Sequence, residues 1–185
     1  MGAVPHVPAA RESAVLVPVP AAEHVVGRHR ARLDRAAAEG VPAHVTILYP
    51  FVAPAEITTA TIEVLAAAVG SVSSFGCGFP RTAWFGEEVL WLASVPDGPF
   101  RALIGAVTAA FPGYPPYGGM TVSDVIPHLT VGDRPPGGVA DLRAAEADVL
   151  GALPVRAVIS HVWLMTGTRE PGSWHAVAEL PLAGS

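Results

Sequence analysis

Two short segments of the chain repeat one order of residue types. His44-Val45-Thr46-Ile47 and His128-Leu129-Thr130-Val131 each contain a histidine, an apolar residue, a threonine and another apolar residue. In a β-strand, residues i and i+2 point to the same face, so each histidine projects beside its threonine while the apolar residues pack into a core. Two such strands facing each other would enclose a site with two imidazoles and two hydroxyls.

These groups suit chemistry on phosphodiesters. A neutral imidazole accepts a proton from an attacking water or hydroxyl, and a protonated imidazole donates one to the leaving oxygen. The ordinary pKa of histidine is about 6.5, so both forms are accessible at neutral pH. The threonine hydroxyls can donate hydrogen bonds to phosphate oxygens that gain charge. One such segment alone fits an ordinary strand histidine, but two copies favour a catalytic pair.

The amino-acid composition excludes several classes of protein and of mechanism. The chain has 185 residues, of which 51% are hydrophobic and 15% charged, and a net charge of −5, which fits one folded unit rather than a disordered chain. All 11 basic residues are arginines, so mechanisms that need a lysine are excluded, among them a Walker-type phosphate loop and a Schiff base. The acidic balance argues against long nucleic acid as a partner. The single cysteine, Cys77, excludes a disulfide framework and a cysteine-rich zinc site.

The location is inferred from absent targeting signals. No apolar run reaches the roughly 18 residues of a membrane helix. The first 11 residues lack the basic start and apolar stretch of a signal peptide. We therefore expect a cytoplasmic protein without a membrane partner. The sequence leaves the oligomeric state open, with a monomer favoured.

Strand-like and helix-like segments alternate irregularly along the chain. The predicted strands are 13–20, 43–49, 71–79, 89–94, 127–131, 155–166 and 174–180. The predicted helices are 23–39, 56–69, 100–111 and 140–150, and 112–119 is a loop rich in proline and glycine. This order favours an α+β fold. Residues 1–12 are expected to form a flexible tail before a single domain over 13–185.

The sequence resembles the 2H phosphoesterases, also called the 2′,5′-RNA ligase-like family, whose signature is two His-hydrophobic-Thr/Ser-hydrophobic motifs. The resemblance extends from Arg30 through Asp34 and Gly40–Thr46 to Phe51, and resumes at Phe111, Pro115–Gly119 and Pro127–Thr130. It implies two pseudo-symmetric lobes of antiparallel sheet with helices outside and the motifs facing each other across a central cleft. It also implies that His44 and His128 act as acid and base, and that Thr46 and Thr130 bind phosphate.

Four further residues are candidate substrate contacts. Arg30 matches an arginine of the family block and could reach the phosphate or pin a loop. Tyr49 and Phe51 follow the first motif and could form either core or a base-stacking platform. Tyr117 lies in the loop before the second motif, where it could form part of the cleft rim.

The function predicted on this resemblance is hydrolysis of a 2′,3′-cyclic or 2′,5′-linked phosphodiester in a small nucleotide or short RNA, without metal or cofactor. RNA ligase activity is a secondary expectation. Alternatives are the same scaffold recruited to a different biosynthetic substrate, and a module that binds a nucleotide or RNA end without turnover. A metal site on the two histidines is a weaker alternative, because no third ligand has a recognisable spacing.

Overall fold

The computed structural model describes residues 11–184, and its strands form one antiparallel sheet. The strand order is β6-β3-β4-β5-β2-β1-β7-β8. The strands are β1 (Glu12–Pro18), β2 (His44–Leu48), β3 (Phe75–Phe85), β4 (Val89–Val95), β5 (His128–Asp133), β6 (Val155–Ile159), β7 (His161–Gly167) and β8 (His175–Pro181).

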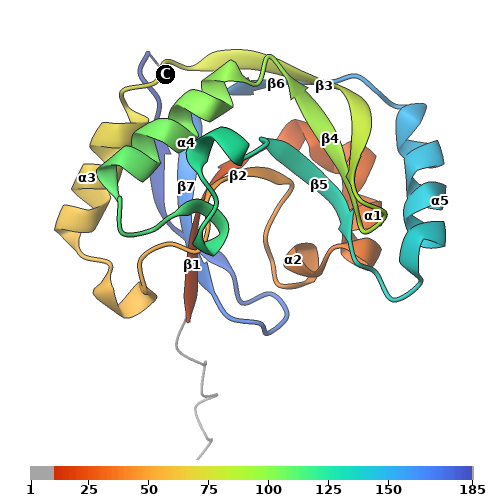
Figure 1. Ribbon diagram of the computed structural model, residues 1–185, viewed down its shortest axis with the longest axis horizontal. Helices are drawn as coiled ribbons and strands as arrows, with labels where there is room; N and C mark the ends of the chain where they lie inside the picture. Colours follow the sequence, from red (N-terminus) through yellow and green to blue (C-terminus); the bar gives the residue numbers. More distant parts are fainter. Residues whose placement is uncertain (1–10, 185) are drawn as a thin grey trace, which may run out of the picture.

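Two four-stranded halves meet at the strands that carry the repeated motifs. One lobe contains β8, β7, β1 and β2, and the other contains β5, β4, β3 and β6. The halves join where β2 and β5 pair antiparallel, with Val45 opposite Leu129. The sheet curls around this junction (Figure 1). The predicted α+β fold with two lobes of antiparallel sheet is thereby confirmed.

The helices lie outside the sheet (Figure 1). The α-helices are α1 (Glu23–Leu33), α2 (Arg35–Ala38), α3 (Thr59–Val69), α4 (Gly98–Ala110) and α5 (Gly138–Leu150), and short 3-10 turns occupy Pro20–Ala22, Pro54–Glu56, Pro116–Gly118 and Val122–Asp124. Helices α1 and α5 pack on the β3–β5 lobe, and α4 packs on β2 with α3 beside it. Helix α4 buries Phe100, Leu103, Ile104 and Val107, a spacing that places them on one helical face.

The main core lies between the helices and one face of the sheet. The other face of each lobe lines the cleft. Val45, Ile47, Leu129 and Val131, the apolar residues of the two motifs, are all within this core. Separate apolar clusters lie on the opposite face of each half. One contains Ala14, Leu16, Val41, Met165 and Trp174, and the other contains Val89, Trp91 and Ala93. The alternation predicted for the motif strands therefore sorts apolar residues to the core and the histidines to the cleft.

The predicted helix over 23–39 is two helices. The chain becomes extended at Asp34, with φ −125° and ψ 112°. The Asp34 Oδ1 atom accepts a hydrogen bond of 3.0 Å from the backbone N–H of Ala36, which makes Asp34 the N-cap of α2. A side chain that caps a new helix start competes with continuation of the preceding helix.

Two predicted strand boundaries are wrong. The strand predicted for 71–79 does not end at residue 79, because β3 runs on to Phe85. Pro80 lies at an irregularity of the β3–β4 register between Gly78 and Arg81, where a residue without an N–H donor is tolerated. The single strand predicted for 155–166 is instead divided at Ser160 into β6 and β7, which pair with β3 and β1 in different lobes of the sheet.

The predicted tail falls largely outside the described residues, because residues 1–10 are not among them. Its last two residues are ordered. Glu12 begins β1, and the backbone N–H of Arg11 donates to the carbonyl of Gly167 at 2.9 Å. The folded part of the chain therefore begins before Ser13.

Candidate active site

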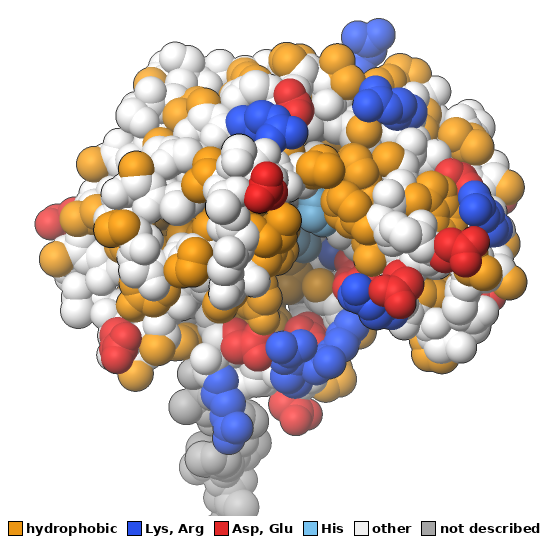
Figure 2. All heavy atoms as spheres, in the orientation of Figure 1, with side chains coloured by type: hydrophobic (Ala, Val, Ile, Leu, Met, Phe, Trp, Pro, Cys, Tyr) orange, Lys and Arg blue, Asp and Glu red, His pale blue; other side chains and the backbone are white. Residues whose placement is uncertain are grey.

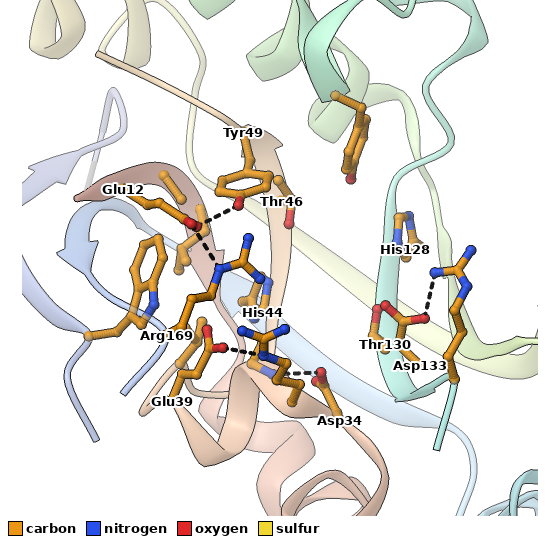
Figure 3. Close-up of a pocket in the computed structure, with 18 residues that line it drawn as sticks. Glu12, Asp34, Glu39, His44, Thr46, Tyr49, His128, Thr130, Asp133 and Arg169 are labelled. Atoms are coloured by element: carbon orange, nitrogen blue, oxygen red, sulfur yellow. Dashed lines mark hydrogen bonds and ion pairs between the residues drawn. The ribbon is translucent and has the colours of Figure 1, made fainter. Parts of the chain in front are cut away.

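The two motifs face each other across a cavity of about 520 Å³. His44 and Thr46 project into it from β2, and His128 and Thr130 project from β5 (Figure 3). Continuing the antiparallel register of Val45 and Leu129 places His44 opposite Thr130 and Thr46 opposite His128. The structure thus brings together the four residues that the sequence singled out. Figure 2 shows the opening as a hollow between the lobes with a histidine inside.

Each imidazole is held by the same backbone contact. Nδ1 of His44 lies 2.7 Å from the carbonyl oxygen of Pro42, and Nδ1 of His128 lies 2.7 Å from the carbonyl oxygen of Ile126. A carbonyl oxygen only accepts, so Nδ1–H is the donor in both contacts. In the neutral imidazole, Nε2 is then unprotonated and available for proton transfer.

Burial lowers the pKa of both histidines, but their charged neighbours differ. For His44, burial and the Arg30 guanidinium lower the pKa to about 4, against smaller upward effects of the Pro42 hydrogen bond and Asp34. For His128, burial lowers the pKa, while the Ile126 hydrogen bond and the Asp133 carboxylate act in the opposite direction. The two imidazoles therefore have different electrostatic surroundings.

Two aromatic side chains flank His128. The Phe85 ring is stacked on Trp91 at 4.8 Å between centroids and meets the His128 imidazole edge-to-face at 4.9 Å. Trp91 lies on β4 opposite Thr130, so it shares the cleft face with the motif residues. These rings restrict the orientation of the His128 imidazole.

Two of the four predicted substrate contacts line the cavity. Tyr49 donates a hydrogen bond of 2.6 Å to Glu12, and burial followed by this contact raises the pKa of Tyr49 to about 12. Tyr117 reaches the cavity from the 3-10 turn before β5, at a positive φ of 50°, with its backbone N–H 2.7 Å from the carbonyl oxygen of Tyr49. Burial also raises the pKa of Tyr117, so both phenols stay protonated at neutral pH. The O–H of Tyr49 is engaged by Glu12, whereas that of Tyr117 can donate to a ligand.

Arg30 does not line the cavity. Its side chain is 2% exposed and donates two hydrogen bonds to Asp34 Oδ2, at 3.0 and 2.8 Å, and a third to the carbonyl of Val41 at 3.2 Å. The expectation that it reaches the phosphate is wrong. It instead pins the segment that leads into His44, because Val41 precedes the carbonyl that holds the imidazole.

Phe51 is also not a cavity residue. It is 5% exposed and meets Phe111 edge-to-face at 4.8 Å, with Tyr114 at 5.8 Å. The alternation that places Thr46 in the cleft does not extend to Phe51, because β2 ends at Leu48. The base-stacking role is therefore wrong and the core role is right.

Four ion pairs surround the histidines and were missed in the sequence. Four of the cavity-lining residues are carboxylates, and each is paired with an arginine: Glu12–Arg169 at 2.8 Å, Asp34–Arg30 at 2.8 Å, Glu39–Arg35 at 2.6 Å and Asp133–Arg134 at 2.9 Å. The Arg30–Asp34 and Arg35–Glu39 pairs both have i, i+4 spacing in or beside a helix, a local signal that could have been found. Among residues 11–184, no three potential metal-ligating side chains are grouped closely enough to hold a metal ion.

Comparisons with known proteins identify the family and the fold. A family model described as the 2'-5' RNA ligase superfamily matches residues 17–171. Among solved structures, E. coli LigT complexed with 3'-AMP aligns with a TM-score of 0.58 at 14% identity, over 94% of this chain and 99% of that one. TT0787 of Thermus thermophilus aligns with the same TM-score, identity and coverage. No curated protein sequence gives a significant match.

The chain belongs to the 2'-5' RNA ligase superfamily, the group of 2H phosphoesterases that the paired motifs suggested. The likeness to the solved structures shows that the fold is that of LigT. Other LigT structures hold ATP and NADP+, so that protein takes small nucleotides. Within residues 11–184, none of the helices is long and apolar enough to cross a membrane.

Proposed function

We propose that the protein hydrolyses a 2′,3′-cyclic or 2′,5′-linked phosphodiester of a small nucleotide or short RNA, with His44 and His128 carrying both proton transfers. One observation carries the proposal. Two imidazoles face one cavity from paired strands, each with Nδ1 tied to a backbone carbonyl and each beside a threonine on the same face. A binding module has no need of two imidazoles fixed in this way.

The chemical step needs one base and one acid. Nε2 of the base takes a proton from water as the water oxygen bonds to phosphorus, and Nε2–H of the acid gives a proton to the ester oxygen as the P–O bond breaks. The products are a phosphate monoester and a free hydroxyl. After this step the base carries an extra proton and the acid has lost one. Proton exchange of both imidazoles with solvent then restores their starting protonation states.

The charged neighbours support His44 as the base and His128 as the acid. The positive charge of the buried Arg30 disfavours the His44 imidazolium, which leaves a neutral Nε2 to accept a proton. Asp133 favours the imidazolium of His128. An anionic phosphate bound between them would raise the pKa of both histidines.

The threonine hydroxyls are proposed to hold the phosphate. Thr46 and Thr130 project beside the histidines and can donate hydrogen bonds to the non-bridging oxygens as charge develops. Tyr49 and Tyr117 approach from the rim of the cavity and are proposed to contact the substrate around the phosphate. The nucleotides held by LigT support a ligand of this size.

An activity assay separates this proposal from its alternatives. Purified protein is tested against nucleoside 2′,3′-cyclic phosphates and 2′,5′-linked dinucleosides, with and without a chelator. Hydrolysis that survives the chelator supports the histidine pair, and loss of activity with the chelator indicates a metal site. Tight binding without turnover indicates a binding module. Failure to bind or cleave any of these compounds indicates that the scaffold acts on a different substrate.

A further inference from the structure

We propose that the wall of the cavity on the β1–β2 lobe is a subsite for an uncharged nucleoside, and that Glu12 and Glu39 exclude substrates with a terminal phosphate. This inference rests on the proposed function, because it assigns the group that flanks the phosphodiester. It concerns a part of the cavity away from His128. That part has an apolar floor and a charged rim.

The floor is apolar and firmly held. Its residues are all less than 9% exposed, and they are Ala14, Leu16, Val41 and Trp174. The Trp174 indole N–H donates to the carbonyl of Thr168 at 3.0 Å, and its backbone N–H donates to the carbonyl of Glu39 at 2.9 Å. A Cβ atom on Gly167 would collide with the Trp174 ring, so glycine is needed for this packing. A floor built in this way is present before any ligand arrives.

The rim carries charge that is already compensated. Glu12 accepts hydrogen bonds from both Tyr49 and Arg169, at 2.6 and 2.8 Å, and Glu39 accepts one from Arg35 at 2.6 Å. The guanidiniums of this wall therefore already face carboxylates. Figure 3 shows these pairs clustered on the His44 side of the cavity.

The balance of charge decides which ligand fits. The cavity lining contains four carboxylates, Glu12, Asp34, Glu39 and Asp133, but only three guanidiniums, Arg35, Arg134 and Arg169. A fourth, Arg30, is buried behind Asp34. There is no surplus of positive charge to compensate a second phosphate, whose oxygens would approach the carboxylates of Glu12 and Glu39. Such like-charge contact is a common means of excluding a ligand. An uncharged planar base on the apolar floor meets no such cost.

The experiment compares ligands that differ by one phosphate. Binding of adenosine 3′-monophosphate and adenosine 3′,5′-bisphosphate is measured by calorimetry on the wild-type protein at low and high salt. We expect the bisphosphate to bind about three to ten times more weakly, with the difference shrinking as salt screens it. In addition, the KM values of two substrates are compared: a 2′,5′-linked diadenosine with a free 5′-hydroxyl and the same compound with a 5′-phosphate.

Two isosteric variants test the assigned residues. Glu12→Gln and Glu39→Gln each remove one negative charge, and each should improve binding of the bisphosphate relative to the monophosphate. Glu63→Gln, on the exposed side of α3 and outside the cavity lining, makes the same charge change elsewhere and should leave the ratio unchanged. Thermal unfolding of each variant checks that it is folded. If one of the two cavity variants does not fold, the other still tests the inference.

The outcomes separate this inference from the proposed function. If the monophosphate is preferred and the two variants relax the preference while no phosphodiester is cleaved, the subsite stands and the hydrolase is wrong. If phosphodiesters are cleaved but the 5′-phosphate makes no difference or improves binding, the subsite is wrong and the hydrolase stands. If neither adenosine phosphate binds, the subsite is overturned.

Discussion

Val45 lies directly opposite Leu129 where the two lobes of the sheet meet. Both side chains are fully buried, so this junction belongs to the core, while the residues on either side of each point into the cleft. One antiparallel pair therefore sets the relative position of both histidines and both threonines. The site is a consequence of how the lobes are joined, and neither lobe contains it alone.

Replacing either histidine should remove most of the activity without unfolding the protein. His44→Ala and His128→Ala are each expected to lower kcat by about 10²–10⁴, the usual loss for a general acid or base. The double variant should lose far less than the product of the two, because the residues act as one unit. Turnover is measured on the preferred phosphodiester, with circular dichroism to check folding. Near wild-type turnover in either single variant would rule out the paired mechanism.

The threonine hydroxyls should serve the transition state more than the bound substrate. Thr46→Val and Thr130→Val keep a β-branched shape suited to a strand but remove the donor. We expect kcat to fall more than affinity for a product analogue, since the hydroxyls stabilise charge that develops during the reaction. The measurement is kcat together with the dissociation constant of a nucleoside monophosphate. A loss confined to affinity would assign the hydroxyls to ground-state binding.

The catalytic residues were predictable because their signal is local. The two-residue alternation of a strand places His44 beside Thr46 whatever surrounds them. The cavity wall was not predictable in this way, because Glu12 and Arg169 are 157 residues apart and meet only when β1 and β7 pair. The chain topology, which no local pattern describes, creates that contact.

The error at Arg30 had a local signal that could have prevented it. Val26, Arg30 and Leu33 share one face of α1, at a spacing of four and then three residues, and that face is buried. The arginine therefore follows the apolar face of the helix rather than the exposed face that carries Arg28 and Arg32. Its charge is compensated by Asp34, one turn further along, where the helix ends.

Arg30 should consequently matter to stability. Arg30→Met leaves Asp34 buried without its partner and frees the Val41 carbonyl, and loss of one member of a buried pair costs about 3–5 kcal/mol. Urea denaturation measures the change in the free energy of unfolding. Arg28→Met is the matched control, since its pair with Asp148 is 71% and 58% exposed and should contribute under about 1 kcal/mol. Equal effects of the two substitutions would contradict the positioning role of Arg30.

Stability should also fall in mild acid because of His44. The unfolded chain protonates this histidine near its ordinary pKa of about 6.5, whereas the folded chain holds the pKa at about 4. Between these values the unfolded state binds more protons, so the free energy of unfolding decreases as pH falls from about 6.5 to about 4. His44→Gln should show a shallower decrease in urea titrations over this range. His24→Gln, an exposed position on α1, should keep the slope of the wild type, and an unchanged slope in the His44 variant would refute the prediction.

The pH dependence of catalysis tests the proposed roles directly. With a base whose pKa is lowered to about 4 and an acid whose pKa is below its ordinary value, kcat/KM of the free enzyme should be bell-shaped with its maximum on the acidic side of neutrality. The acidic limb reports protonation of the base, and the basic limb reports loss of the proton from the acid, although the two values belong to the coupled pair. A bound phosphate anion favours both imidazolium forms, so both limbs of the kcat profile should lie at higher pH than those of kcat/KM.

Asp133→Asn removes the carboxylate that favours protonated His128 and should move the basic limb of kcat/KM to lower pH, while the acidic limb stays in place. A chelator should leave every curve unchanged. A single rise to a plateau near neutral pH that disappears with the chelator would show that the histidines bind a metal, because a metal-bound water would then be the titrating group.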